Sequence, residues 1–167
     1  MLLISICFPT YGQRFDKGQN INLSLGYVKK GVNVGIGYEK FLSRQDAIFF
    51  EFDYSDRSAS LRTHEQKANL SDYFVTAAYR RYFNMGKFFP YFGIGIFGGY
   101  QNFRNKANFP PSILIERENG GLFGVHPEVG LEANFGAFSV NLAFVSRYEF
   151  LFEDFLPEIR LGVKYYF

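Results

Sequence analysis

The sequence predicts an all-β protein, an eight-stranded antiparallel up-and-down transmembrane β-barrel. Aromatic residues make up 20% of the 167 residues, with 22 Phe and 12 Tyr, yet the mean hydropathy is only −0.10. Apolar residues must therefore alternate with polar ones, as in barrel strands with an apolar outer face and a polar inner face. Outside the N-terminus, the sequence contains no run of eighteen apolar residues that could form a membrane-spanning helix. The length fits one domain, and a net charge of +2 is too small for a nucleic-acid surface.

Eight segments alternate with a period of two, which places every second side chain on the same face of a strand. In the first three, the apolar faces carry Ile21, Leu23, Leu25 and Tyr27, then Val32, Val34, Ile36 and Tyr38, then Ile48, Phe50, Phe52 and Tyr54. The fourth segment, 73–83, is less regular, since Arg81 shares the apolar face and Arg80 points the other way. No helical periodicity of useful length competes with these four strands.

The second half of the chain continues the pattern. The fifth segment, 92–99, places Phe92, Ile94 and Ile96 outward and glycines inward. The sixth, 123–132, and the seventh, 138–149, again oppose apolar and polar residues. In the eighth, 157–167, the apolar face runs from Ile159 to the terminal Phe167. This last segment resembles the C-terminal strands of bacterial outer-membrane barrels, in which such a pattern is the assembly signal.

The connections predict the orientation. Three are tight turns near Ser43, Asn84 and Asn134, whereas the others include expected loops of about fifteen residues from Asp56 and about nineteen from Asn102, with shorter ones at Val28 and 149–156. Outer-membrane barrels have short periplasmic turns and longer external loops, so both termini are expected in the periplasm. Five outward tyrosines are expected at the external ends of their strands as an interfacial ring: Tyr27, Tyr54, Tyr73, Tyr100 and Tyr148. Phe83, Phe88 and Phe167 are expected to mark the periplasmic interface.

The inner face is predicted to be charged. An eight-stranded barrel has an interior just wide enough for side chains, as in OmpX-type barrels, so buried charges there must pair. The mixed signs favour an ion-paired plug, and a selective channel lined by the same residues is the alternative. The expected structural lumen residues are Glu39, Glu51, Asp53, Arg80, His126, Glu128, Glu132, Arg147, Glu158, Arg160 and Lys164.

The N-terminal segment is interpreted as a secretory signal. Residues 1–12 combine a short apolar run with small residues before an expected cleavage site at Gln13, although a basic n-region is missing, which points to a truncated start. Residues 13–18 would then be a short lead, and 19–167 the barrel domain. Ile6 stands where a lipoprotein needs a small residue, which argues against lipidation of Cys7. The mature chain would contain no cysteine.

Catalysis is not expected, and neither is a cofactor or a metal site. His126 lies on the inner face two residues from Glu128, without a visible hydroxyl partner, and His64 lies in the second external loop near Ser58, Ser60 and Glu65. A nucleophile would need a positioned hydrogen-bonded relay, so a satisfied lumen histidine is the better interpretation of His126. No phosphate loop, metal-ligand spacing or dinucleotide motif is present.

External loops are where function is expected. The third contains an apolar cluster at Ile113, Leu114 and Ile115 after a Pro-Pro pair, and the fourth, EFLFEDFLP, is also rich in apolar residues. These stretches either pack on each other above the membrane or dock a partner, because exposed apolar patches favour interaction sites.

The whole mature chain resembles the small outer-membrane barrels of the Bacteroidetes. From about Phe92 to Glu149 it is similar to the conjugative-transposon TraO proteins, through the segments GIGIFGGYQNF, GGLFGVHPEVGLEANFG and SRYEF. The resemblance implies an outer-membrane part of a DNA-transfer apparatus and brings no catalytic residues.

Three functions remain open from the sequence: a structural or interaction barrel of a conjugation apparatus, a general small barrel acting in adhesion or surface protection through its loops, and a lipid A-modifying enzyme. The expected partners are outer-membrane lipid and lipopolysaccharide, the barrel-assembly machinery through the C-terminal strand, and other conjugation proteins. Direct nucleic-acid binding is not expected.

Overall fold

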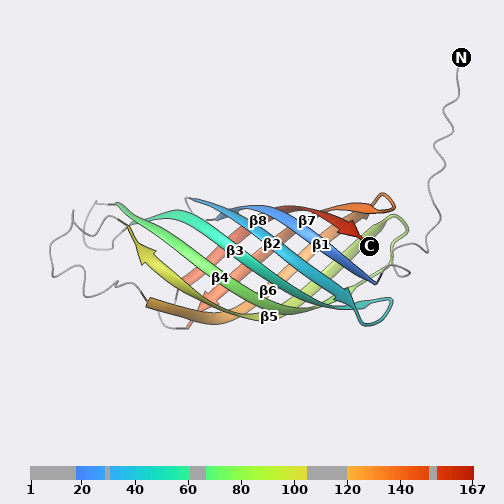
Figure 1. Ribbon diagram of the computed structural model, residues 1–167, viewed down its shortest axis with the longest axis horizontal. Coiled ribbons are helices and arrows are strands. Elements are labelled where there is room, and N and C mark those ends of the chain that lie inside the picture. Colours follow the sequence, from blue (N-terminus) through green and yellow to red (C-terminus); the bar gives the residue numbers. More distant parts are fainter. Residues whose placement is uncertain (1–17, 29–30, 61–66, 105–119, 151–153) are drawn as a thin grey trace, which may run out of the picture.

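The computed structural model describes residues 18–28, 31–60, 67–104, 120–150 and 154–167. Eight antiparallel strands pair in chain order, and β1 also pairs with β8, so the sheet closes into a barrel (Figure 1). The strands are β1 (Gln19–Val28), β2 (Gly31–Phe41), β3 (Asp46–Ser60), β4 (Lys67–Tyr82), β5 (Phe88–Phe103), β6 (Gly120–Asn134), β7 (Phe138–Glu149) and β8 (Asp154–Tyr166). The predicted all-β, eight-stranded up-and-down barrel is confirmed.

The strands are staggered by ten residues around the barrel. Successive paired residues starting from β1 are Asn22, Gly37, Glu51, Thr76, Phe97, Gly124, Glu149 and Asp154. This row of paired residues starts at Asn22 of β1 and ends at Asp154 of β8. Because Glu158 of β8 pairs with Val28 of β1, Asp154 lies level with position 32 of the chain, if β1 is extended past its end. The row therefore returns to β1 ten residues beyond Asn22, and this offset is the stagger. With eight strands this stagger corresponds to a strand tilt of roughly 40° from the barrel axis.

Three tight turns connect strands at the end of the barrel where β1 begins and β8 ends, called here the terminal rim. In the β4–β5 turn the Asn84 side chain accepts a hydrogen bond from the Gly86 amide at 3.0 Å, and in the β6–β7 turn Asn134 accepts one from Gly136 at 2.7 Å. Both glycines have positive φ, 76° and 90°, which a glycine adopts without strain. The repeated Asn-x-Gly motif therefore fixes two of the three reversals that bring the strands into register.

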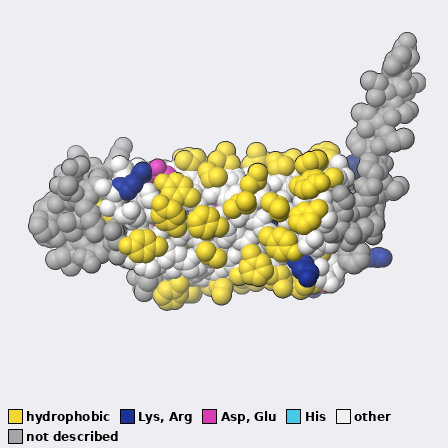
Figure 2. All heavy atoms as spheres, viewed as in Figure 1, with side chains coloured by type: hydrophobic (Ala, Val, Ile, Leu, Met, Phe, Trp, Pro, Cys, Tyr) yellow, Lys and Arg dark blue, Asp and Glu magenta, His cyan; other side chains and the backbone are white. Residues whose placement is uncertain are grey.

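The alternation in sequence becomes an alternation between inside and outside. Along β1 and β2 every second residue is buried, and the residues between them are exposed. On the face shown in Figure 2, hydrophobic side chains form a broad band across the middle of the barrel, with charged side chains near its two edges. An apolar outer wall around a polar interior is the arrangement of a transmembrane β-barrel.

Two strands continue further than the sequence pattern predicts. The expected fifteen-residue loop from Asp56 is wrong, because β3 extends to Ser60 and β4 begins at Lys67. Tyr54 and Tyr73 consequently lie six residues inside their strands, not at the strand ends. The outward residues beyond them are polar, among them Asp56 and Ser58, so the apolar alternation ends although the strands continue.

Several predictions concern residues outside the described part of the chain. They are the signal at 1–12, most of the lead at 13–18, His64 and the Ile113–Ile115 cluster, together with much of the predicted external loops. Within the described residues, no helix is long and apolar enough to span a membrane.

Candidate functional site: the charged interior

All eleven predicted lumen residues lie inside the barrel, and none is more than 3% exposed. Three further charged residues join them: Arg57, Asp72 and Glu149. Glu149 stands on the polar face of the alternating seventh segment. Arg57 and Asp72 fall in the region predicted as a loop, so the alternation did not include them. The described interior thus contains five Lys or Arg side chains and eight carboxylates.

The cluster nearest the terminal rim is built around Lys164. Its Nζ donates hydrogen bonds to Glu39 Oε2, Glu132 Oε2 and the Tyr82 hydroxyl, each at 2.8 Å. Tyr82 also donates to Glu39, and Tyr166 donates to Glu132. Lys164 is completely buried, so these oxygens replace the water that an exposed ammonium would bind.

Arg80 links this cluster to the middle of the barrel. Its Nη2 donates to Glu128 Oε2 at 2.9 Å, its Nε also bonds Glu128, and its Nη1 lies 3.4 Å from Glu39 Oε1. The guanidinium stacks over the ring of Phe49, 3.4 Å from the ring centroid. Bidentate pairing and aromatic stacking are arrangements that arginine makes and lysine does not.

The central cluster contains two arginines and three carboxylates. Arg147 contacts Glu158 at 2.8 Å and Asp53 at 2.6 Å. Arg160 contacts the same two carboxylates, at 2.9 Å and 3.2 Å, and also pairs with Glu51.

Polar side chains complete the hydrogen bonding of these carboxylates. Asn33 donates to Asp53 at 3.0 Å and to Glu158 at 2.9 Å, and Ser24 donates to Glu51 at 2.9 Å. The carboxylates are therefore held by neutral donors as well as by guanidinium groups, which a buried charge requires.

Arg57 forms a third cluster toward the opposite end of the barrel, called here the loop rim. Its Nε contacts Asp72 Oδ2 at 2.6 Å, and its Nη2 lies 3.8 Å from Glu149 Oε1. Gln101 donates to the other Asp72 oxygen at 3.0 Å. Charged groups are thus paired along the length of the described interior.

Several of these contacts cross the interior. β3 and β7 are separated by three strands in either direction around the barrel, so they face each other across it. The bond from Arg147 on β7 to Asp53 on β3 therefore spans the full width of the interior. Side chains from opposite walls therefore meet in the middle of the barrel at this level.

Glycines on the inner face make room for these long side chains. A Cβ built on Gly26 would lie 1.9 Å from Glu158 Oε1, and one on Gly35 would lie 2.6 Å from Asp53 Oδ1. A Cβ on Gly93 would lie 2.5 Å from Glu128. The inward glycines therefore allow charged groups from neighbouring strands to pack across the strand backbone.

His126 is completely buried, with its Nε2 3.8 Å from Glu128 Oε2. Neither ring nitrogen has a hydrogen-bond partner among the described residues, and the same holds for the Thr76 hydroxyl. The predicted neighbourhood of His126 and Glu128 exists, but the contact is longer than a hydrogen bond. His126 thus lies on the inner face beside Glu128, as predicted, and its interpretation as a satisfied lumen histidine stays a prediction.

The outer aromatic residues lie at both edges of the apolar band. Tyr54 pairs with Tyr73 and Tyr73 with Tyr100 on three adjacent strands, so these tyrosines form a continuous row toward the loop rim. Tyr27 and Tyr148 are also exposed near the ends of β1 and β7 at the same rim. Exposed phenylalanines at the terminal rim include Phe83, Phe88 and Phe167. Such girdles suit the two interfaces of a bilayer.

Comparison with solved structures identifies the same fold in known outer-membrane proteins. Neisserial surface protein A superposes with a TM-score of 0.64 at 9% identity, over 89% of this chain and 96% of that one. The N-terminal β-barrel domain of Pseudomonas aeruginosa OprF gives 0.59 at 14% identity, with the same coverage of each chain. Ail, the attachment invasion locus protein of Yersinia pestis, in complex with the heparin analogue sucrose octasulfate, gives 0.55 at 14%, again over 89% and 96%.

These likenesses define the class of protein, a small eight-stranded barrel of the outer-membrane type. At such low identity they establish the fold alone. No protein-family model matches the sequence, and no curated protein matches it as a relative. The comparisons contain nothing specific to the TraO proteins, to conjugation or to the Bacteroidetes.

Proposed function

We propose that the protein is a small barrel of the bacterial outer membrane, with its terminal rim in the periplasm and its loop rim outside the cell. The connection lengths support this orientation. Four residues separate β2 from β3 at the terminal rim, whereas sixteen separate β5 from β6 at the loop rim. Short periplasmic turns and longer external loops are the rule for such barrels.

We further propose that the protein acts through its external surface, in adhesion or surface protection, and not through transport. The observation that carries this proposal is the cross-barrel contact of Arg147 with Asp53, which occupies the interior. A barrel whose interior is filled by paired side chains presents its loops as the accessible surface. At the level of fold, the likeness to a surface protein and to an attachment protein supports the same role.

The test is a surface assay on whole cells. Bacteria lacking their own adhesins would express either the wild-type chain or a variant with residues 105–119 replaced by a short Gly-Ser turn, at matched surface amounts. We expect the variant to lose attachment to host cells, or survival in serum, while its barrel remains heat-modifiable on gels. Equal attachment and equal survival of the two strains would contradict the proposal.

The conjugation role predicted from the sequence stays a prediction, because no comparison favours it. Deletion of the gene followed by measurement of mating frequency tests it directly.

We propose no catalytic step, although one structural neighbour is the outer-membrane enzyme PagL, with a TM-score of 0.51 at 11% identity. Unchanged lipid A mass spectra with and without the protein are the expected result. Recognition of the C-terminal strand by the barrel-assembly machinery also remains a proposal.

A further inference from the structure

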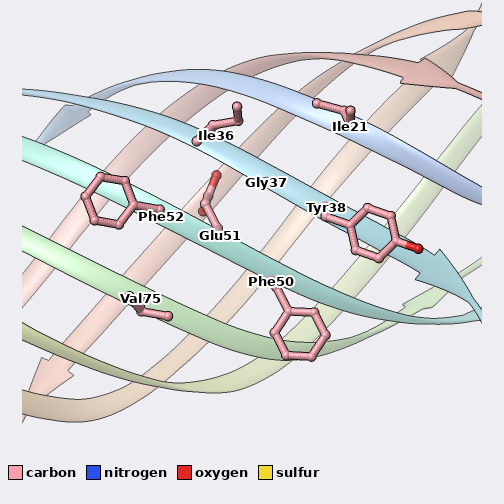
Figure 3. Close-up of a pocket in the computed structure, with 8 residues that line it drawn as sticks. All are labelled: Ile21, Ile36, Gly37, Tyr38, Phe50, Glu51, Phe52 and Val75. Carbon is pink, nitrogen blue, oxygen red and sulfur yellow. The ribbon is translucent and has the colours of Figure 1, made fainter.

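A shallow groove of about 430 Å³ lies on the outer wall of the barrel, on its β1–β4 side (Figure 3). Its walls are six apolar side chains, Ile21, Ile36, Tyr38, Phe50, Phe52 and Val75. The carboxylate of Glu51 does not make the groove polar, because Glu51 points inward and pairs with Arg160. The groove is therefore an apolar hollow within the outer band.

An acyl chain fits such a hollow, but the hollow alone does not select a lipid. Neighbouring lipid tails are as apolar as the groove, so placing a tail there replaces one apolar contact with another. Preference for one lipid must come from its headgroup, at the edge of the apolar band.

Basic side chains gather at that edge. Lys40 is exposed on the outer face of β2, two residues beyond Tyr38, and it pairs with Ile48 of β3. Arg81 is exposed at the end of β4, and Arg44 and Lys87 lie exposed in the β2–β3 and β4–β5 turns. All four belong to the part of the terminal rim formed by β2–β5.

Asp46 is the carboxylate that lies beside Arg81 at this rim. Asp46 accepts hydrogen bonds from Tyr79 and, at 2.7 Å, from Ser43, and it lies 3.8 Å from Arg81. Lys40 and Arg81 together carry one positive charge more than Asp46 balances. This edge is therefore complementary to an anionic headgroup.

We propose that the groove and Lys40 form a binding site for an anionic glycerophospholipid, with one acyl chain in the groove and the phosphate on the Lys40 ammonium. Arg81 adds longer-range attraction from the next hairpin. The proposal rests on the membrane placement proposed above, which assigns this edge to the periplasmic leaflet. Lipopolysaccharide is the competing source of an anionic, acylated ligand, and its predicted location is the opposite leaflet.

Native mass spectrometry of the folded full chain tests the proposal. The protein would be released from micelles containing equal amounts of phosphatidylglycerol and phosphatidylethanolamine, and the ratio of the two bound forms measured. We expect phosphatidylglycerol to be retained preferentially, and Lys40→Gln to reduce this preference about fivefold, the effect of one basic residue near an anionic lipid surface. Val75→Trp, which fills the groove, should reduce total lipid retention, whereas Leu142→Trp on β7, the strand opposite β3, should not.

Two results would overturn the lipid site while leaving the membrane placement intact. One is a heat-modifiable, micelle-inserted barrel that shows no preference for phosphatidylglycerol. The other is a preference unaffected by both Lys40→Gln and Val75→Trp. If purified lipid A displaced phosphatidylglycerol and its binding depended on Lys40, the assigned lipid class would be wrong. Failure of the wild-type chain to enter micelles or bilayers would instead overturn the proposed membrane placement.

Discussion

Replacing Arg147 with methionine tests the cross-barrel ion pairing most sharply. Arg147 is 2% exposed, and its guanidinium contacts Glu158 at 2.8 Å and Asp53 at 2.6 Å. It also lies over the Phe74 ring, 4.7 Å from the ring centroid. Methionine retains apolar contact but removes the charge and both ion pairs.

The expected loss of unfolding free energy is about 3–5 kcal/mol, the usual effect of removing one partner from a buried pair. The central cluster has two arginines and three carboxylates, so its formal charge changes from −1 to −2 in Arg147→Met. Adding Asp53→Asn returns the charge to −1. The double variant should therefore be more stable than Arg147→Met alone, because it leaves one fewer buried carboxylate without its partner.

The assay is reversible urea unfolding in phospholipid vesicles, followed by far-ultraviolet circular dichroism. Arg104→Met is the matched control, because Arg104 pairs with Asp56 on the surface, where both side chains are more than 40% exposed. The control should change stability by less than about 1 kcal/mol. Two results would refute the account of a paired interior. One is an Arg147→Met variant that is as stable as the Arg104→Met variant. The other is a double variant, Arg147→Met with Asp53→Asn, that is less stable than Arg147→Met alone.

Two further predictions concern close packing and barrel closure. Gly124→Val should prevent formation of the heat-modifiable barrel, because even a Cβ would lie 1.9 Å from the backbone carbonyl oxygen of Tyr148. Gly98→Val should fold, because the nearest atom to its Cβ is 3.9 Å away. Equal folding of the two variants would contradict this packing. Leu25 of β1 pairs with Leu161 of β8, so the double variant Leu25→Cys and Leu161→Cys tests the closure of the sheet. In a chain whose one native cysteine has been removed, oxidation should join the two new cysteines in an intramolecular disulfide. Absence of this disulfide under oxidising conditions would contradict closure between β1 and β8.

The sequence predicts the strands well wherever one face meets lipid. Ile21, Leu23 and Leu25 alternate with small polar residues, and they are exposed while Asn22 and Ser24 are buried. The pattern fails beyond Tyr54, where Asp56 and Ser58 face outward above the apolar band. There the alternation of apolar and polar residues ends, but β3 and β4 remain paired as far as Ser60 and Lys67. The pattern therefore does not predict that Arg57 and Asp72 belong to strands and point into the barrel.

The pairing partners inside the barrel were beyond reach of the sequence. Arg147 and Asp53 are 94 residues apart and meet only because of the strand order and the ten-residue stagger. The alternation indicates that both point inward, but it says nothing about their relative heights. Small errors in register would therefore assign different partners to every charge.

The glycine-rich segments that resemble TraO proteins have a structural explanation in this barrel. A Cβ on Gly95 would lie 2.4 Å from the Ala77 carbonyl oxygen, and one on Gly124 would lie 1.9 Å from the Tyr148 carbonyl oxygen. Close strand approach thus accounts for glycine at these positions, whatever the function. The motifs are consequently evidence for the barrel, and they do not by themselves support a role in conjugation.

Ion conductance across a planar bilayer is the most direct test of a barrel closed by paired charges. With the purified full-length protein inserted, we expect no steady current above the protein-free baseline. The Arg147→Met variant, if it inserts, should give measurable openings, because the contact that spans the interior is lost. A steady, reproducible conductance from the wild-type protein would contradict the closed interior and favour a selective channel.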